Sequence, residues 1–570
     1  MVGTDSDMEK NVKTQDVSVA IESGSETGQD DAASGPLGDS EGRAADSAAA
    51  AKPPPPWSWK ITAIVLVSLI RFGGSWSNGI TGAMKSTMKK EMHINNQRYA
   101  LLEASEDFMT TLLILGTGLL TDRVGGAGLL FFGNLVYTAG SLLVAAAAQT
   151  RSFPFMIGGR VVLSLGDIST QIAQYQVFSS WFAPSSGFAS TLGLELMISK
   201  LGALAGTGSA NHIAVRTGNF AWVFWVAVFI NIFTNIVCFF YLWFVRRSAG
   251  KFGNVVDPAT GEKLKQKSKK LELGKIFRLP WSFWSIMIYS LFTTSTAVVF
   301  KQNATEMAEQ RFKVSAVTAG WYSALLQYAG FFIVPVVGVC IDLFGQRVSL
   351  MVIGGTGTFI AMSLVQWAGA VKGTAAGFGI YAIVSSYSPT VIIDSMRTSL
   401  YHQTDFGTAY ALKIMMNNSI NIIVRILAGV IQDADHNSYN KVVILYLVLA
   451  GCSLFVSLSL AVLAYFSVNL GALQWSRKQR HARVEKLLEM KRTFYETKAR
   501  RNSIISRTCF GLLICLLLGG LVGLLLGSCH GREEDLVTKG ILSSIICQHR
   551  FVGSRDYIPS QLNYRSNHRL

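Results

Sequence analysis

Charged residues are scarce in this sequence of 570 residues. Aspartate, glutamate, lysine and arginine make up 15% of the chain, whereas about 25% is usual in a soluble domain. Hydrophobic residues make up 50%, and they gather in many runs longer than the roughly 18 residues that a membrane-spanning helix needs. The sequence therefore predicts an all-α polytopic membrane protein.

Motifs for metal binding, nucleotide binding and catalysis are also missing. The seven cysteines are scattered singly, without a CxxC pair or a Cys/His cluster, so we expect no metal site. No GxxxxGK[ST] segment is present, which argues against transport driven by ATP. The net charge of +16 does not indicate a nucleic-acid partner, because the basic residues lie in loops beside apolar runs, where they set membrane orientation. We expect no enzyme activity and no cofactor.

A stretch rich in lysine and arginine divides the apolar runs into two groups of six. Residues 246–278 hold ten basic residues against three acidic ones. Because basic loops favour the cytosol, we expect this linker and a second basic stretch to lie there, with an even number of spans between them. The expected segments are a disordered cytosolic tail (1–56), a first six-helix bundle (57–245), a basic linker (246–280), a second six-helix bundle (281–468), a basic amphipathic segment at the membrane surface (469–507), a thirteenth membrane helix (508–527) and a tail of unknown structure (528–570).

One short motif, GxxxDxxG, occurs at corresponding places in the two groups of spans. This repetition indicates internal duplication, and hence two pseudo-symmetric six-helix bundles. The glycines allow helices to approach closely and the aspartate can cap a neighbouring helix end, so we expect a gate; the alternative is a tight turn that needs only glycine. The motif residues are Gly118, Asp122, Arg123 and Gly125 in the first group, and Gly338, Asp342 and Gly345 in the second.

Two opposite charges lie in consecutive apolar spans. Asp167 and Lys200 each fall near the middle of a hydrocarbon layer roughly 30 Å thick. A lone charge at that depth costs at least a few kcal/mol, so it should face a partner or a water-filled cavity. We expect either a binding site in which one acid and one base contact a zwitterionic ligand, or a structural ion pair that locks two helices.

Further polar residues accompany this pair in the first group of spans. Gln171 and Gln174 follow Asp167 by one and two helical turns and should extend its face. Arg71 in the first span either neutralises Asp167 or faces the substrate. Glu195 lies five residues before Lys200 and should point elsewhere; it is either a proton site or gate partner, or a residue without a role.

The second group of spans offers a matching set. Lys413 and Asn417 either line the opposite wall of the cavity or make hydrogen bonds that pack helices. Arg425 lies nearer the end of its span and should snorkel toward the membrane surface. Asn303 begins a glycosylation sequon in the loop expected after the seventh span.

The paired loop motif resembles that of the major facilitator superfamily, whose members have twelve spans in two six-helix halves. Three stretches resemble its lysosomal dipeptide transporter branch more closely: Met84–Arg123, Gly158–Phe182 and Leu192–Gly202. This resemblance implies an alternating-access uniporter or secondary transporter that exports dipeptides from the lysosome or vacuole. It also implies an accessory membrane glycoprotein partner, alongside the substrate and membrane lipid. By position, Asp167 would hold the peptide's amino end and Lys200 its carboxyl end.

Two other functions fit the same residues. A carrier of organic anions or sugar phosphates would use Arg71, Lys200 and Lys413 together, with Asp167 as a structural partner. A transporter-like receptor or scaffold would instead make contacts through its basic tail and a C-terminal face of small residues. The glycines of that face are Gly519, Gly523 and Gly527.

Overall fold

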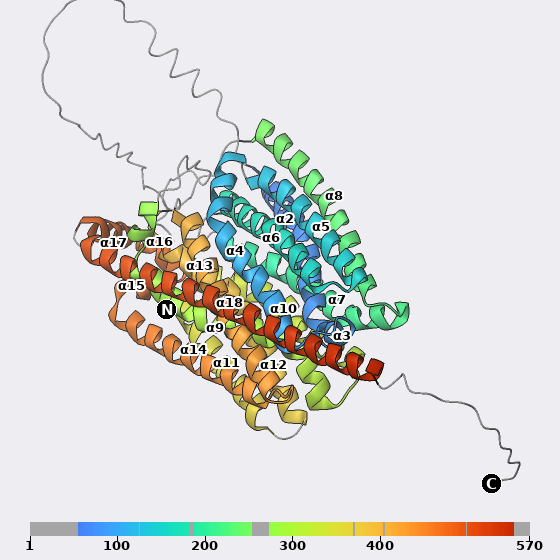
Figure 1. The fold of residues 1–570 in the computed structure, drawn as a ribbon. Coiled ribbons are helices and arrows are strands. Elements are labelled where there is room, and N and C mark those ends of the chain that lie inside the picture. Colours follow the sequence, from blue (N-terminus) through green and yellow to red (C-terminus); the bar gives the residue numbers. More distant parts are fainter. Residues whose placement is uncertain are drawn as a thin grey trace, which may run out of the picture. The chain divides into compact units, whose positions relative to one another are not determined.

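The computed structural model describes residues 55–124, 126–182, 187–252, 273–368, 371–402, 405–496 and 499–551, and within these ranges the chain is helical without strands (Figure 1). Six long helices form the first half, with the short α3 between the first two. The helices of this half are α2 (Trp57–Ala83), α3 (Lys85–Glu91), α4 (Asn96–Val124), α5 (Gly126–Thr150), α6 (Phe153–Trp181), α7 (Phe188–Thr217) and α8 (Ala221–Lys251).

Six more long helices form the second half, and the chain then continues through short helices into one further long helix. The second half comprises η1 (Leu273–Arg278), α9 (Trp281–Phe312), α10 (Ala316–Phe344), α11 (Arg347–Trp367), α12 (Val371–Ser399), α13 (Phe406–Ala434) and α14 (Asn440–Phe466). After it come α15 (Val468–Gly471), η3 (Ala472–Gln474), α16 (Arg477–Ala482), α17 (Val484–Glu496) and α18 (Ala499–Phe551).

Eleven of the described helices are long and apolar enough to cross a membrane. Among the twelve long helices of the two halves, α4 and α6 are the exceptions, and both carry charged side chains within the bundle. These charges have partners on neighbouring helices, described below, which makes their burial tolerable. The predicted fold of two six-helix bundles with an extra C-terminal hydrophobic helix is confirmed.

The two loop motifs lie at the same end of the molecule. The start of α5 packs beside the last turns of α6, where Gly126 approaches Gln176 and Val177. The start of α7 is bonded to the end of α10 through Ser190 and Asp342. One residue separates the end of α4 from the start of α5, and six separate the end of α6 from the start of α7, so the ends of α4, α6 and α10 share one side. We call this side the linker end, and the opposite side, which carries α3, the α3 end.

Small residues let the halves approach closely at the linker end. A Cβ atom on Gly338 of α10 would lie 2.7 Å from the carbonyl oxygen of Ala189 in α7, closer than real contacts allow. Gly345 ends α10 with φ of 75°, a left-handed conformation that favours glycine. Both motif glycines therefore have a backbone role, as the sequence predicted for Gly338.

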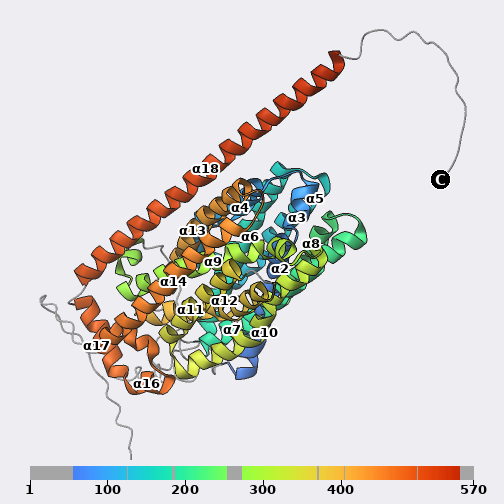
Figure 2. The ribbon, with the colours of Figure 1, turned by 90° about the horizontal axis from the view of Figure 1, so that it is seen from below.

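Helix α18 contains the predicted thirteenth span and runs along α13 (Figure 2). Gly519 and Gly523 face Ile423 and Ile426 of α13. The predicted small-residue face therefore packs, within the described part of α18, against the second half of the same chain. The hydroxyl of Ser506 anchors the start of this helix by donating a hydrogen bond to the Leu279 carbonyl oxygen, 2.8 Å away.

Candidate functional site

Arg71 and Asp167 form an ion pair inside the first half. Arg71 Nη1 lies 2.6 Å from Asp167 Oδ1, and this pair joins α2 to α6. Gly74, one turn along α2, leaves room for both groups beside Tyr137. The same two residues line a narrow pocket with Gln174. Of the two roles expected for Arg71, the structure shows neutralisation of Asp167.

Lys200 does not pair with Asp167. It lies half-buried in α7, and its aliphatic stem packs on Gly330 of α10, beside Ser386 of α12. No carboxylate of the described residues is within ion-pair distance of its ammonium group. The expected alternative of a structural Asp167–Lys200 pair is therefore wrong, because Arg71 takes that place and Lys200 faces the second half.

Glu195 lies within the site, and the expectation that it points elsewhere is wrong. It is 2% exposed, and it interacts electrostatically with Arg71 and contacts Gln174. Its Oε2 has no hydrogen-bond partner among the side chains that the structure describes. Tyr175 and Tyr410, whose ring centroids are 4.6 Å apart, cover this cluster where the halves meet. The sequence signal that could have placed Glu195 in the site is an acidic residue within an apolar span.

The second half contributes two half-buried lysines. Lys413 of α13 lies with its ammonium group 5.7 Å from the centroid of the Tyr410 ring. Lys301 of α9 is within electrostatic range of Lys200. In the described ranges, neither has a carboxylate partner. The sequence reading missed Lys301 because it lies at the edge of the expected seventh span.

The amide side chains that the sequence suggested for the site differ in burial and in their contacts. Asn417 is buried, and its Nδ2 donates to Ser290 Oγ at 3.2 Å and Thr294 Oγ1 at 3.4 Å, which packs α13 on α9. This geometry fits the packing alternative rather than a cavity wall. Gln171 is half-buried in α6, whereas Gln174 is buried and reaches toward the Val67 carbonyl oxygen of α2.

The glycosylation hypothesis for Asn303 is wrong. Asn303 lies inside α9 rather than in a loop, and it is buried. Its Oδ1 accepts a hydrogen bond from Lys85 Nζ at 2.8 Å, and its Nδ2 donates to Tyr446 Oη at 2.7 Å. A glycan on this nitrogen would have no room and would break the bond to Tyr446.

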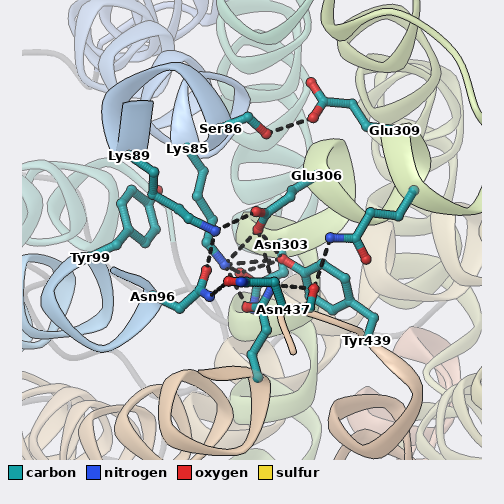
Figure 3. Close-up of polar contacts among 12 residues, drawn as sticks. Lys85, Ser86, Lys89, Asn96, Tyr99, Asn303, Glu306, Glu309, Asn437 and Tyr439 are labelled. Carbon is teal, nitrogen blue, oxygen red and sulfur yellow. Dashed lines mark hydrogen bonds and ion pairs between the residues drawn. The ribbon is translucent and has the colours of Figure 1, made fainter. Parts of the chain in front are cut away.

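Asn303 belongs to a network that joins the halves at the α3 end (Figure 3). Glu306 of α9 binds Lys85 Nζ at 2.9 Å and Lys89 Nζ at 2.7 Å. The Lys85 ammonium group also donates to Gln432 and Tyr439 of the second half. Lys85 is only 3% exposed. These bonds close the α3 end of the interface between the halves.

Arg425 also joins the halves, so the expectation that it snorkels is wrong. Its guanidinium group binds Glu103 at 2.8 Å and Asp107 at 2.9 Å, both in α4 of the first half. Arg425 is buried, and the opposite charges of Glu103 and Asp107 offset the free-energy cost of burying its charge.

The second gating motif is bonded across the halves at the linker end. Asp342 Oδ2 accepts hydrogen bonds from Ser190 N at 2.8 Å and Ser190 Oγ at 2.6 Å, and so caps the first turn of α7. The matching first motif lies partly outside the described residues. Gly125 is not described at all, and only the backbone is described for Gly118, Asp122 and Arg123.

Replacing Asp342 with alanine should slow transport while leaving ligand affinity nearly unchanged. The change removes two hydrogen bonds that hold the halves together at the linker end, far from the central charges. Losing about 1.5 kcal/mol of such bonding shifts the closed population roughly tenfold. Transport rates and ligand titrations of the purified variant check this, with Glu485→Ala, an exposed acid in α17, as the control. An equal loss of binding and rate would contradict the gating role.

A family comparison identifies the architecture. The model of the Major Facilitator Superfamily matches residues 64–392. The chain belongs to the major facilitator superfamily. It is accordingly a multi-pass membrane transporter of small molecules rather than an enzyme, and the resemblance found in the sequence is confirmed.

Relatives and solved structures of the superfamily are distant in sequence. The lysosomal dipeptide transporters MFSD1 of Mus musculus and Homo sapiens are 22% and 23% identical to this chain, each covering 74% of it and 89% of their own length. The solved proton:xylose symporter XylE is similar with a TM-score of 0.58 at 12% identity, over 73% of this chain and 99% of its own. The structural likeness thus supports the superfamily fold, without indicating a substrate.

Proposed function

We propose that this superfamily member carries small zwitterions, and dipeptides first, across a membrane by alternating access. The observation that carries the proposal is Lys200, a half-buried cation that faces the second half and lacks a carboxylate in the described ranges. A buried unpaired charge costs several kcal/mol, so a bound anionic group is the natural partner. The relatives named as dipeptide transporters support a ligand that carries one carboxylate and one ammonium group.

The two ends of the ligand are proposed to meet different charges. Lys200 holds the carboxylate, with Lys301 of the second half close enough to add attraction. The ammonium group meets Asp167, of which Arg71 engages only Oδ1, with Glu195 as a second buried acid. Arg71 then has a positioning role, since it fixes the Asp167 carboxylate for the incoming group.

The proposed location and direction of transport are supported by the charge distribution and by the relatives. The basic linker and the basic segment near the C-terminus favour a cytosolic linker end. The α3 end would then face the lumen of a lysosome or vacuole, and dipeptides would leave for the cytosol by uniport. An accessory membrane glycoprotein is proposed only because of the likeness to that transporter branch.

A second candidate is a carrier of organic anions or sugar phosphates. It is favoured by three half-buried lysines, Lys200, Lys301 and Lys413, that have no carboxylate partner among the described side chains. The Arg71–Asp167 pair would then be structural, as its distance of 2.6 Å also permits.

Thermal-shift titration of the purified chain separates the two candidates. A free dipeptide should raise the melting temperature, whereas the N-acetylated and the C-amidated forms should each raise it less. Stabilisation by the N-acetylated form equal to that by the free dipeptide would favour the anion carrier. No stabilisation by any dipeptide would contradict dipeptide binding.

A further inference from the structure

The narrow pocket at Arg71 and Asp167 leaves space beside these two charges. A Cβ atom added to Gly74 of α2 would lie 3.6 Å from both Arg71 Nη1 and Asp167 Oδ1, and 3.7 Å from Tyr137 Oη of α5. These are ordinary van der Waals distances, so a methyl group fits here without displacing its neighbours. The space adjoins the carboxylate that is proposed to meet the ammonium group of the ligand.

The remaining walls of this pocket combine polar and aliphatic side chains, all of them buried. Asn134 already donates a hydrogen bond to Thr234, 3.0 Å away, and the Thr170 hydroxyl donates to a carbonyl oxygen of its own helix at 2.8 Å. Because these two groups are bonded within the protein, they do not require a hydrogen bond from a ligand. The pocket thus suits a short, uncharged group, either a methyl or a hydroxymethyl. Its other lining residues are Ile70, Leu130 and Gln174.

Close contacts between helix backbones fix the width of the pocket. Gly166 of α6 lies so near the backbone of Tyr137 in α5 that no Cβ atom would fit between them. On the side of α2 that faces α7, a Cβ atom on Gly202 would lie 2.7 Å from the Phe72 carbonyl oxygen. Helices packed this tightly separate only by losing many contacts at once. The pocket therefore cannot widen to admit a large side chain.

We propose that this pocket receives the side chain of the first residue of a dipeptide, and that Gly74 sets its size limit. This assignment rests on the proposed function, in which Asp167 meets the ammonium group. The first side chain branches from the carbon atom that bears this ammonium group, so it lies beside the same carboxylate. The second residue carries the carboxylate that is proposed to meet Lys200, and its side chain lies outside the pocket.

The substrate class that follows is a dipeptide with a small first residue. Glycine, alanine and serine fit the space beside Gly74, whereas an aromatic or a long basic side chain does not. The second residue is not subject to this limit. The parent chain should therefore bind glycyl-phenylalanine more tightly than phenylalanyl-glycine, although the two have the same atoms and the same charged ends.

Gly74→Ala should change this preference without disturbing the fold. Its methyl group makes only ordinary contacts with the protein, but it occupies the space that the first side chain needs. Competition for the volume of one methyl group should weaken binding of seryl-glycine by roughly tenfold or more. Glycyl-serine has no first side chain and should bind the variant nearly as it binds the parent. Gly74→Ser fills the same space and should behave alike, which provides a second variant.

Thermal-shift titration of the full-length chain with these isomeric dipeptides measures the affinities. Gly451→Ala is the matched control, because its added Cβ atom would lie 3.7 Å from the Phe359 ring in the second half, an ordinary contact outside the site. It should bind both seryl-glycine and glycyl-serine like the parent.

The outcomes separate this proposal from the proposed function. Equal weakening of both isomers by the Gly74 variants, or no weakening of either, would overturn the size limit and leave dipeptide binding intact. A parent chain that binds phenylalanyl-glycine as tightly as glycyl-phenylalanine would do the same. A folded parent chain that binds none of the four dipeptides would overturn both proposals.

Discussion

Lys200→Gln should weaken binding of a free dipeptide by roughly a hundredfold, the effect of leaving one buried carboxylate unpaired. The same change should have little effect on a C-amidated dipeptide, which has no carboxylate to lose. The reason is geometric, because Lys200 faces the second half without an acid partner in the described ranges. Thermal-shift titrations with both ligands measure the two affinities. Lys441→Gln, an exposed lysine paired with Asp435, serves as the control and should behave like the parent chain.

A structural role for Lys200 predicts a different pattern. The variant would then melt at a lower temperature without ligand, and it would lose affinity for both dipeptides equally. Equal losses would contradict the assignment of Lys200 to the ligand carboxylate, whatever their size.

Arg347→Met should lower the free energy of unfolding by about 3–5 kcal/mol, because it leaves a buried carboxylate unpaired. Arg347 Nε lies 2.5 Å from Asp394 Oδ2, and the two side chains are 1% and 0% exposed. This pair joins α11 to α12 inside the second half. Thermal unfolding of the purified chain in detergent measures the loss. Arg492→Met, in an exposed pair with Glu496, should change the stability by less than about 1 kcal/mol.

The double variant Arg347→Met with Asp394→Leu distinguishes a buried pair from simple loss of packing. Removing both charges leaves no unpaired charge, although the hydrogen bond from Arg347 Nη1 to the Leu473 carbonyl oxygen is lost with them, so most of the stability should return. A double variant as unstable as Arg347→Met alone would show that packing of the arginine, rather than its charge, stabilises this part of the fold.

The fold could be predicted because its signals are local. Apolar runs mark the spans, and the repeated GxxxDxxG motif relates the halves. The partners of charged residues inside the bundle were harder to predict, because the sequence gives the depth of a charge in the membrane but not the direction in which its side chain points. Arg71 is 14 residues from the start of α2 and Asp167 is 14 from the end of α6, whereas Lys200 is 12 from the start of α7. At about 1.5 Å per residue these depths differ by only about 3 Å, so depth alone does not choose between Arg71 and Lys200.

The polar networks at the α3 end were missed for a related reason. The sequence placed Asn303 in a loop after the seventh span, whereas α9 continues to Phe312. Its last turns carry Asn303 and Glu306, which are buried by Lys85 and its neighbours of the other half. Polar residues buried between two halves have the same composition as a loop, so only the packing of the halves distinguishes them.

Uptake of a labelled dipeptide into liposomes that contain the purified full-length chain tests the central claim most directly. We expect saturable uptake that unlabelled dipeptide inhibits, that a dipeptide blocked at both ends does not inhibit, and that Lys200→Gln abolishes. Liposomes with the Lys441→Gln variant should take up the dipeptide like the parent chain. Uptake no greater than in protein-free liposomes, with the protein shown to be folded, would contradict transport of dipeptides by this chain.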